Sequence, residues 1–224
     1  MGVEHHRRGF DVDAALAHVS RHDKRLARWL PQIPPLLPDP RWEQPFDPVD
    51  ALARAILFQQ LSGKAAATIV GRVEQAIGSG FLHADTLGRV DDPTLRACGV
   101  SSNKLRALRD LAERARRGEI PAVEDMQQMD NEAIIAALTP VRGIGRWTVE
   151  MMLIFRLGRA DVLPVDDLGV RKGLQRVDEL IEVPTAKVLA ARGECWAPWR
   201  SVAALALWRI SDLGVAAPTP RSQE

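Results

Sequence analysis

Two adjacent carboxylates, Asp166 and Asp167, stand just before a stretch whose pattern predicts a helix over about Leu168 to Leu174. Aspartate at such a position is most often an N-cap, because its side-chain oxygen accepts a hydrogen bond from the second or third helical amide. One of the two can cap the helix while the other faces a cleft as an ionised group. A carboxylate beside a cleft can stabilise a developing positive charge, so capping and catalysis both remain open for this pair.

A second motif lies about 20 residues before the pair, in the run Arg142-Gly-Ile-Gly-Arg-Trp-Thr148. Gly143 and Gly145 let the backbone turn tightly and approach a ligand closely, and the helix that follows presents unpaired amide groups. Such a helix N-terminus can hold a phosphate group without a lysine. A plain turn between two helices would carry the same glycines, so the motif alone leaves both interpretations open.

Tryptophans gather in a third segment, from Trp196 to Trp208, and the chain has six tryptophans but no tyrosine. Most tryptophans fill protein cores, although an indole face can also bind a ligand by stacking. Composition does not separate these two roles, so the position of each tryptophan must decide.

Apolar residues at helical spacing predict helices nearly throughout the chain, and the near absence of alternation predicts no sheet, so the fold class is all-α. An apolar stretch over Thr148 to Leu157 predicts a buried central helix. An N-terminal helix over about Val12 to Leu30 should lead into a proline-rich connector at residues 31–45. Other helix boundaries are indicated by starts at Asp47-Pro48, Lys64, Asp92-Pro93, Ser101 or Ser102, and Asn131, and by terminators at Gly99 and Gly118.

The 30 Lys and Arg are balanced by 29 Asp and Glu, so a surface for a polyanion must come from local segregation of charge. Six cations, among them Lys104, stand against two anions between Ser101 and Gly118. No apolar run approaches the roughly 20 residues that span a bilayer, and the first ten residues lack a signal-peptide core. The two cysteines lie outside any CxxC pair, which argues against a four-cysteine zinc or iron–sulfur site. We therefore expect a cytoplasmic globular protein.

Four motifs follow one another in the chain: QQLSGKAA (Gln59 to Ala66), RGIGRWT (Arg142 to Thr148), LPVDDLGVRKGL (Leu163 to Leu174) and WAPWRS (Trp196 to Ser201). Together they resemble the helix-hairpin-helix DNA glycosylase superfamily, of the 3-methyladenine DNA glycosylase II type, over roughly Phe46 to Asp212. The resemblance implies a helix-hairpin-helix glycosylase fold with two helical lobes flanking a cleft and no β domain. In one catalytic unit over 1–224 we expect a central lobe at about 47–160, with the hairpin at 138–152, a second lobe at about 11–46 plus 161–216, and a disordered tail at 217–224.

The resemblance implies a base excision repair enzyme that flips an alkylated base out of double-stranded DNA and hydrolyses its N-glycosidic bond. It makes Asp167 the catalytic carboxylate, acting electrostatically or as a general base, and gives Asp166 a structural role. The base pocket would be lined by Trp147, Trp208 and Met151. Leu61, with Gln60 beside it, would be the wedge that fills the gap left in the DNA, although its spacing alone would place it in the core.

The hairpin would hold the DNA backbone, with phosphate contacts from Gly143, Gly145, Arg146 and Lys104. The resemblance also suggests a structural monovalent cation on the carbonyls of Val141 and Gly143, and it implies no required cofactor.

The chain departs from the family pattern at two positions. Arg142 replaces the proline that commonly precedes Gly-Ile-Gly, and Met151 stands where relatives carry an aromatic residue. Relatives that also cut the DNA strand keep a lysine at the position of Trp147, so we expect a monofunctional enzyme that leaves an abasic site.

Two other functions stay open from the sequence: a glycosylase for another damaged base, such as uracil or hypoxanthine, and a non-catalytic helix-hairpin-helix DNA-binding module. For any of them we expect double-stranded DNA as the partner, no membrane, no obligate protein partner and a monomer.

Overall fold

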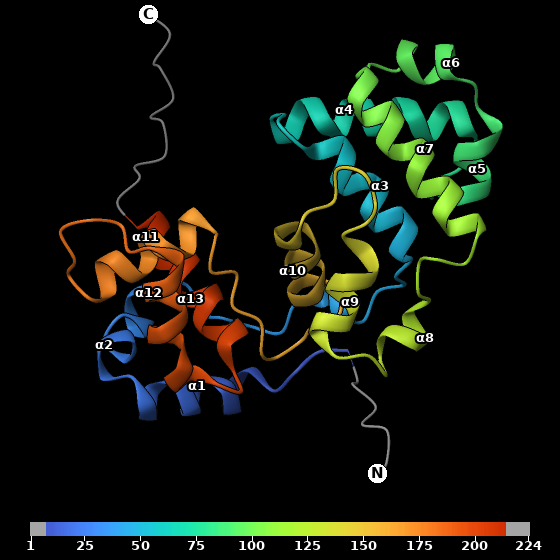
Figure 1. The fold of residues 1–224 in the computed structure, drawn as a ribbon. Coiled ribbons are helices and arrows are strands. Elements are labelled where there is room, and N and C mark those ends of the chain that lie inside the picture. The colour runs from blue at the N-terminus through green and yellow to red at the C-terminus, as the bar shows by residue number, and fades with distance from the viewer. Residues whose placement is uncertain (1–7, 214–224) are drawn as a thin grey trace, which may run out of the picture. The chain divides into compact units, whose positions relative to one another are not determined.

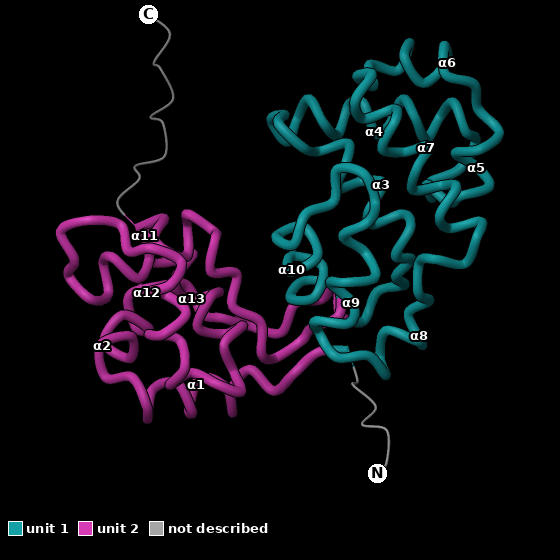
Figure 2. The backbone as a smooth tube through the Cα atoms, viewed as in Figure 1, with its two compact units in different colours: residues 1–8, 43–156 teal, residues 9–42, 157–224 magenta. Residues whose placement is uncertain are grey.

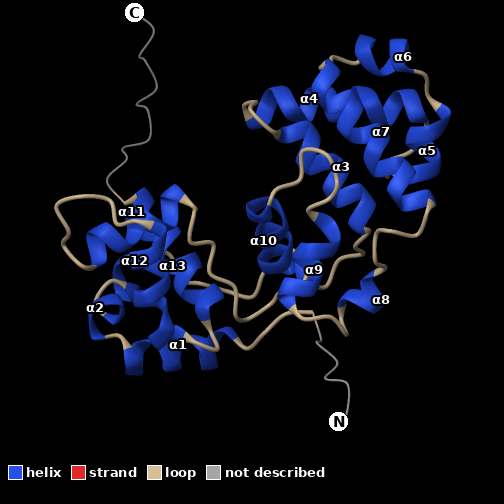
Figure 3. Cartoon of the chain, in the orientation of Figure 1, coloured by secondary structure: helices blue, strands red, loops and turns tan. Residues whose placement is uncertain are grey.

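The computed structural model describes residues 8–213, and every regular element within them is a helix (Figure 3). None of these helices is long and apolar enough to cross a membrane. The described chain divides into two compact units (Figure 2): Arg8 with residues 43–156, and residues 9–42 with 157–213. The tail expected to be disordered from residue 217 lies outside the described residues.

The first unit packs around α7, which lies against α3 and α5 (Figure 1). Its buried centre includes Leu52 and Ile56 of α3 and Leu108 and Leu111 of α7, at 1% exposure or less. These residues recur at three- and four-residue spacing, as the sequence pattern predicts for two helices that share one core. The helices of this unit are α3 (Pro48–Phe58), α4 (Gly63–Ile77), α5 (Ala84–Arg89), α6 (Asp92–Ala97), α7 (Ser102–Arg116), α8 (Val123–Met126), α9 (Asn131–Leu138) and α10 (Arg146–Phe155).

Helices of the first unit start at or within one residue of the indicated positions, although the caps of α6 and α9 are Asp91 and Asp130, one residue before the expected Asp92 and Asn131. The side chains of Asp47, Asp91, Ser101 and Asp130 each accept a hydrogen bond from an amide in the first turn of α3, α6, α7 and α9. The predicted terminators Gly99 and Gly118 adopt φ angles of 98° and 72°, a left-handed conformation that glycine tolerates.

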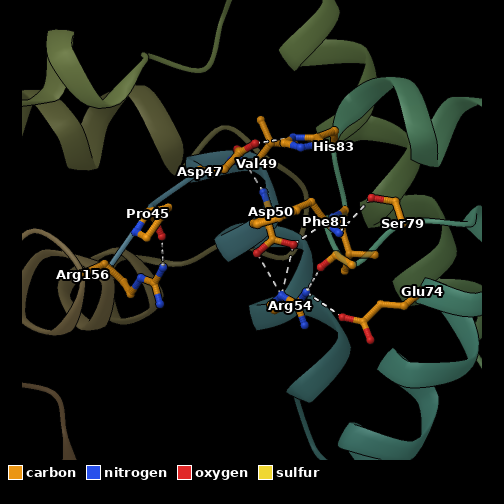
Figure 4. Close-up of polar contacts among 12 residues, drawn as sticks. Pro45, Asp47, Val49, Asp50, Arg54, Glu74, Ser79, Phe81, His83 and Arg156 are labelled. Atoms are coloured by element: carbon orange, nitrogen blue, oxygen red, sulfur yellow. Dashed lines mark hydrogen bonds and ion pairs between the residues drawn. The ribbon is translucent and has the colours of Figure 1, made fainter. Parts of the chain in front are cut away.

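Polar contacts fix the start of α3 against its neighbours (Figure 4). Asp47 caps the helix and also contacts the imidazole of His83. Two turns later, Arg54 pairs with Asp50 at 2.9 Å and with Glu74 of α4 at 2.7 Å. These contacts hold the helix whose other end leads to the expected wedge.

The second unit joins the N-terminal and C-terminal parts of the chain, and its main packing is between α11 and α13. A Cβ atom added at Gly173 of α11 would lie 2.1 Å from the carbonyl oxygen of Leu207 in α13, so the two backbones approach closely there. The elements of this unit are α1 (Val12–His22), α2 (Lys24–Ala27), η1 (Leu30–Gln32), η2 (Pro40–Trp42), α11 (Leu168–Val177), α12 (Ala186–Arg192), η3 (Gly193–Trp196) and α13 (Arg200–Asp212).

The continuous helix expected over residues 12–30 is wrong, because the chain breaks at Asp23, where φ is −133° and ψ is 95°. The buried carboxylate of Asp23 caps α2, accepts the indole N–H of Trp196 at 2.8 Å and pairs with Arg192 at 2.6 Å. A buried charge needs such partners, and meeting them takes Asp23 out of the helical conformation.

Candidate active site and nucleic-acid interface

Asp167 lies at the N-terminus of α11 and is the residue that caps it. Its Oδ1 accepts the amide N–H of Val170 at 2.9 Å and the indole N–H of Trp208 at 2.8 Å. Asp166 is exposed and does not cap the helix, so capping belongs to the second aspartate of the pair and not to the first. Asp167 directly precedes the first helical residue, which brings its side chain within reach of the third helical amide.

Gly169 lets Asp167 and Trp208 meet, and sequence reasoning missed it. A Cβ atom at this position would lie 2.9 Å from Cδ1 of Trp208 and 3.1 Å from Oδ1 of Asp167. A larger residue would therefore push the carboxylate and the indole apart. The available signal was a glycine in the second position of a helix, where it weakens the helix and needs a packing reason.

The loop that leads to Asp167 is tied to the start of α13. Arg200 binds Asp161 with two hydrogen bonds of 2.6 and 2.7 Å. The buried hydroxyl of Ser201 donates to the carbonyl of Arg159 at 2.6 Å and accepts the amide of Val162 at 3.0 Å. These contacts explain the Arg-Ser pair of the tryptophan-rich motif, whose Trp196 is fully buried and fills the core.

The hairpin joins α9 to α10 in the first unit. Gly143 has a φ of 81°, and Gly145 is the N-cap of α10 without a side-chain cap, so amides of the first turn are left for a ligand. Both glycines are exposed. This geometry fits the phosphate-binding interpretation of the motif.

The two carbonyls expected to bind a monovalent cation already accept hydrogen bonds. The carbonyl of Val141 accepts the amide of Ile144 at 3.0 Å, and the carbonyl of Gly143 accepts Nε2 of Gln59 at 2.8 Å. Among residues 8–213, no group of three or more His, Cys, Asp or Glu side chains is placed to hold a metal ion. Each carbonyl oxygen keeps a second lone pair, so a monovalent cation on Val141 and Gly143 stays a prediction.

Side chains tie the hairpin to α7 and to the end of α3. Besides the contact from Gln59, the amide of Arg142 donates to Oδ2 of Asp110 at 2.8 Å. Lys104 donates from Nζ to the carbonyl of Leu57 at 2.7 Å, and burial lowers the pKa of this lysine. Lys104 therefore supports the C-terminal end of α3, and its phosphate contact stays a prediction.

The expected wedge lies in the loop between α3 and α4. Gln60 is exposed and has a φ of 56°, which is unusual for a residue other than glycine, and Leu61 is 40% exposed. The alternative that Leu61 packs in the core is therefore wrong. Exposed leucine at a loop tip suits insertion into an apolar gap.

The first turns of α10 carry the other expected pocket residues of this unit. Trp147 is 50% exposed, and Met151 lies one turn later and is half-buried. Arg146 pairs with Glu132 at 2.9 Å and with the buried Glu150 at 3.0 Å, and the hydrogen bond that it donates to Glu132 is the main cause that raises the pKa of Arg146. Two carboxylates thus hold the guanidinium that was expected to contact phosphate.

Comparison with known proteins agrees with these motifs. Residues 53–198 match the family model described as HhH-GPD superfamily base excision DNA repair protein. The DNA-3-methyladenine glycosylase 1 of Schizosaccharomyces pombe is 38% identical over 197 residues, which are 88% of this chain and 86% of that protein. The DNA-3-methyladenine glycosylase 2 of Escherichia coli is 30% identical over 69% of this chain and 55% of its own length.

Solved structures give the same result. The S. pombe 3-methyladenine DNA glycosylase in complex with abasic DNA superposes with a TM-score of 0.74 at 37% identity, over 90% of this chain and 98% of that one. A DNA-3-methyladenine glycosidase of Bacillus halodurans superposes with a TM-score of 0.80 at 35% identity, over 91% and 92% of the two chains. From its hairpin, its aspartate motif and these matches, the chain belongs to the HhH-GPD superfamily of base excision DNA repair proteins.

Proposed function

We propose that this protein is a DNA N-glycosylase that hydrolyses the N-glycosidic bond of alkylated bases of the 3-methyladenine kind. The observation that carries the proposal is Asp167, held at the N-terminus of α11 by two hydrogen bonds to one oxygen, one of them from the indole of Trp208. The names of the relatives supply the class of base.

DNA binding begins at the first unit. The amides at Gly143 and Gly145 hold a backbone phosphate at the N-terminus of α10. The glycosidic bond of a stacked base is out of reach, so the nucleotide must leave the duplex. Leu61 then occupies the space that the base has vacated and replaces its stacking contacts.

The flipped base is recognised by charge as well as by shape. Alkylation at a ring nitrogen makes a purine positively charged, and such a ring stacks favourably on the electron-rich face of an indole. Trp208, whose indole N–H donates to Asp167, supplies such a ring in the second unit. A cationic base also leaves without being protonated, so the site needs no general acid.

Cleavage of the glycosidic bond leaves positive charge on the sugar, which the carboxylate of Asp167 stabilises until a water molecule adds at the anomeric carbon and gives up a proton. Two unit charges about 4 Å apart attract by about 4 kcal/mol at an effective dielectric constant near 20. That energy corresponds to an acceleration of about a thousandfold. The hydrogen bonds from Val170 and Trp208 hold the carboxylate in place before the charge develops.

Replacement of Asp167 by asparagine tests this role without removing the cap. The amide oxygen of asparagine accepts the same two hydrogen bonds, so the fold should survive while the negative charge is lost. With duplex DNA containing 3-methyladenine, followed by alkaline cleavage at abasic sites, we expect Asp167→Asn to release base about a thousandfold more slowly. Asp166→Asn, which removes the exposed neighbouring charge, should remain active. Full activity of Asp167→Asn would overturn the mechanism.

The reaction should stop at the abasic site. Trp147 has no amine, so it does not form a Schiff base with the sugar. After borohydride treatment of a reaction on substrate DNA, we expect no covalent protein–DNA adduct on a denaturing gel. A trapped adduct would contradict this prediction. A panel of oligonucleotides with single lesions, including uracil and hypoxanthine, defines the range of bases.

A further inference from the structure

A cavity of about 510 Å³ in the first unit lies along α7, beside the segment that enters the hairpin. The apolar part of its lining comes from Leu105 and Pro140. Its charged lining has four arginines and two aspartates, which are Asp92, Arg106, Arg109, Asp110, Arg114 and Arg142. The lining of the cavity therefore carries an excess of positive charge, although the chain as a whole is nearly neutral.

Two of these arginines are engaged by the two aspartates. Arg109 donates to Asp92 at 2.8 Å, and it also donates to two carbonyls near the end of α5. Arg114 binds Asp110 at 3.1 Å and Glu119 at 2.8 Å. The carboxylates of the cavity are thus already neutralised.

Arg106 and Arg142 carry the remaining positive charge. Arg106 is exposed and hydrogen-bonds the neutral side chain of Asn103. The exposed guanidinium of Arg142 has no hydrogen bond or ion pair with any residue in the part of the chain that the structure describes. The backbone of Arg142 is nevertheless fixed, because its amide donates to Asp110 at 2.8 Å. A cation on a fixed backbone, without a carboxylate partner, is prepared for an external anion.

We propose that Arg106 and Arg142 bind DNA phosphates next to the phosphate held by the hairpin, so that the α7 cavity extends the backbone-binding surface. A guanidinium matches phosphate oxygens with two parallel hydrogen bonds. Arg142 directly precedes Gly143, and a DNA strand carries a charge about every 3.4 Å along its axis. A strand anchored at the hairpin amides therefore brings its adjacent phosphates to these side chains. The inference rests on the proposed function in one respect only, that DNA is the ligand.

The salt dependence of DNA binding tests the proposal. We would measure Kd for an undamaged duplex at several salt concentrations, for the wild type, Arg106→Gln, Arg142→Gln and the double variant. The slope of log Kd against log salt should fall by about one for each arginine removed. Arg142→Lys keeps the charge but loses the planar fork, so its slope should stay near that of the wild type while its Kd rises.

Arg116→Gln is the matched control, because Arg116 lies on the same helix outside the cavity and is paired with Glu113. Its slope should equal that of the wild type. An unchanged slope in the double variant would overturn the proposal and would favour an acidic protein segment as the occupant of the cavity. An equal fall in the slope of Arg116→Gln would overturn it as well. Thermal unfolding of each variant excludes loss of fold.

Failure of the proposed function would be visible separately. Base release from 3-methyladenine DNA under saturating enzyme should have the same single-turnover rate in the control Arg116→Gln as in the wild type. A wild type that binds duplex DNA with the expected slope but releases no base would remove the glycosylase proposal and leave the phosphate contacts standing.

Discussion

At the residue scale, the site depends on the contact between Asp167 and Trp208. Helix-capping chemistry predicts a role for an aspartate before α11, and the family resemblance predicts the tryptophan. Their hydrogen bond could not be predicted, because 41 residues separate them and a capping pattern is local. The same limit explains why Gly169 was missed: its importance comes from the indole above it.

Gly169→Ala should therefore disturb catalysis more than stability. The new methyl group meets both Asp167 and Trp208, and a displacement of about 1 Å at a reacting group costs about a hundredfold in rate. Single-turnover base release measures this loss, and DNA affinity should change little. Gly71→Ala on the exposed side of α4 meets nothing within 4 Å, so this control should keep its rate and gain slightly in stability. Equal rates for both variants would contradict the prediction.

At the scale of elements, local signals predicted most helix starts, and tertiary contacts decided the exceptions. Asp47 and Ser101 each accept a hydrogen bond from an amide no more than three residues away, so a local pattern indicates them. Asp23 breaks the N-terminal helix where it binds Trp196. Trp196 lies 173 residues away in the chain, so no local pattern indicates the break. Lys104 supports α3 through a carbonyl 47 residues earlier, which no pattern within α7 indicates.

Asp23→Asn should destabilise the second unit. Burial by itself raises the pKa of Asp23, but hydrogen bonds from Arg192, the Leu26 amide and the Trp196 indole lower it overall. Loss of the charge removes one of the two carboxylates that pair with Arg192 and should lower the free energy of unfolding by about 3 kcal/mol at neutral pH. Urea denaturation measures this difference.

The pH dependence of that difference has a definite sign. The ordinary pKa of aspartate is about 3.9, and the folded value lies below it. The stabilisation by Asp23 is therefore complete above about pH 4 and is lost as the pH falls through the lowered pKa. Wild type and Asp23→Asn should converge in stability at acid pH. Asp13→Asn in the exposed first turn of α1 is the control and should cost little at any pH.

At the scale of the whole molecule, the chain passes between its two units three times, after residues 8, 42 and 156. The first and third passages are hydrogen-bonded to each other on either side of the boundary. Arg8 donates to the carbonyl of Arg156 at 2.9 Å in the first unit, and Gly9 donates to the carbonyl of Leu157 at 3.2 Å in the second. Sequence motifs suggested two lobes but contain no information on how these segments pair.

Gly158→Ala should loosen this paired segment. A Cβ atom there would lie 2.3 Å from the amide nitrogen of Gly9, and the φ of 61° adds backbone strain. Overpacking and strain together should cost about 3 kcal/mol in the free energy of unfolding. Gly78 has a φ of 67°, but a Cβ atom there would meet nothing within 4 Å. Gly78→Ala should therefore lower the free energy of unfolding by only about 1 kcal/mol. If chemical denaturation gives the same loss of unfolding free energy for both variants, the close approach of Gly158 to Gly9 does not contribute to stability.

The split of the second unit between both ends of the chain has a consequence for biosynthesis. The ribosome completes residues 43–156 as one continuous stretch, so the hairpin half can fold while translation is still under way. Residues 9–42 must wait, because the buried Asp23 lacks its ion pair with Arg192 and the indole of Trp196 until those residues emerge. The unit that bears Asp167 is therefore completed last, and a nascent chain halted before that point contains the hairpin without Asp167.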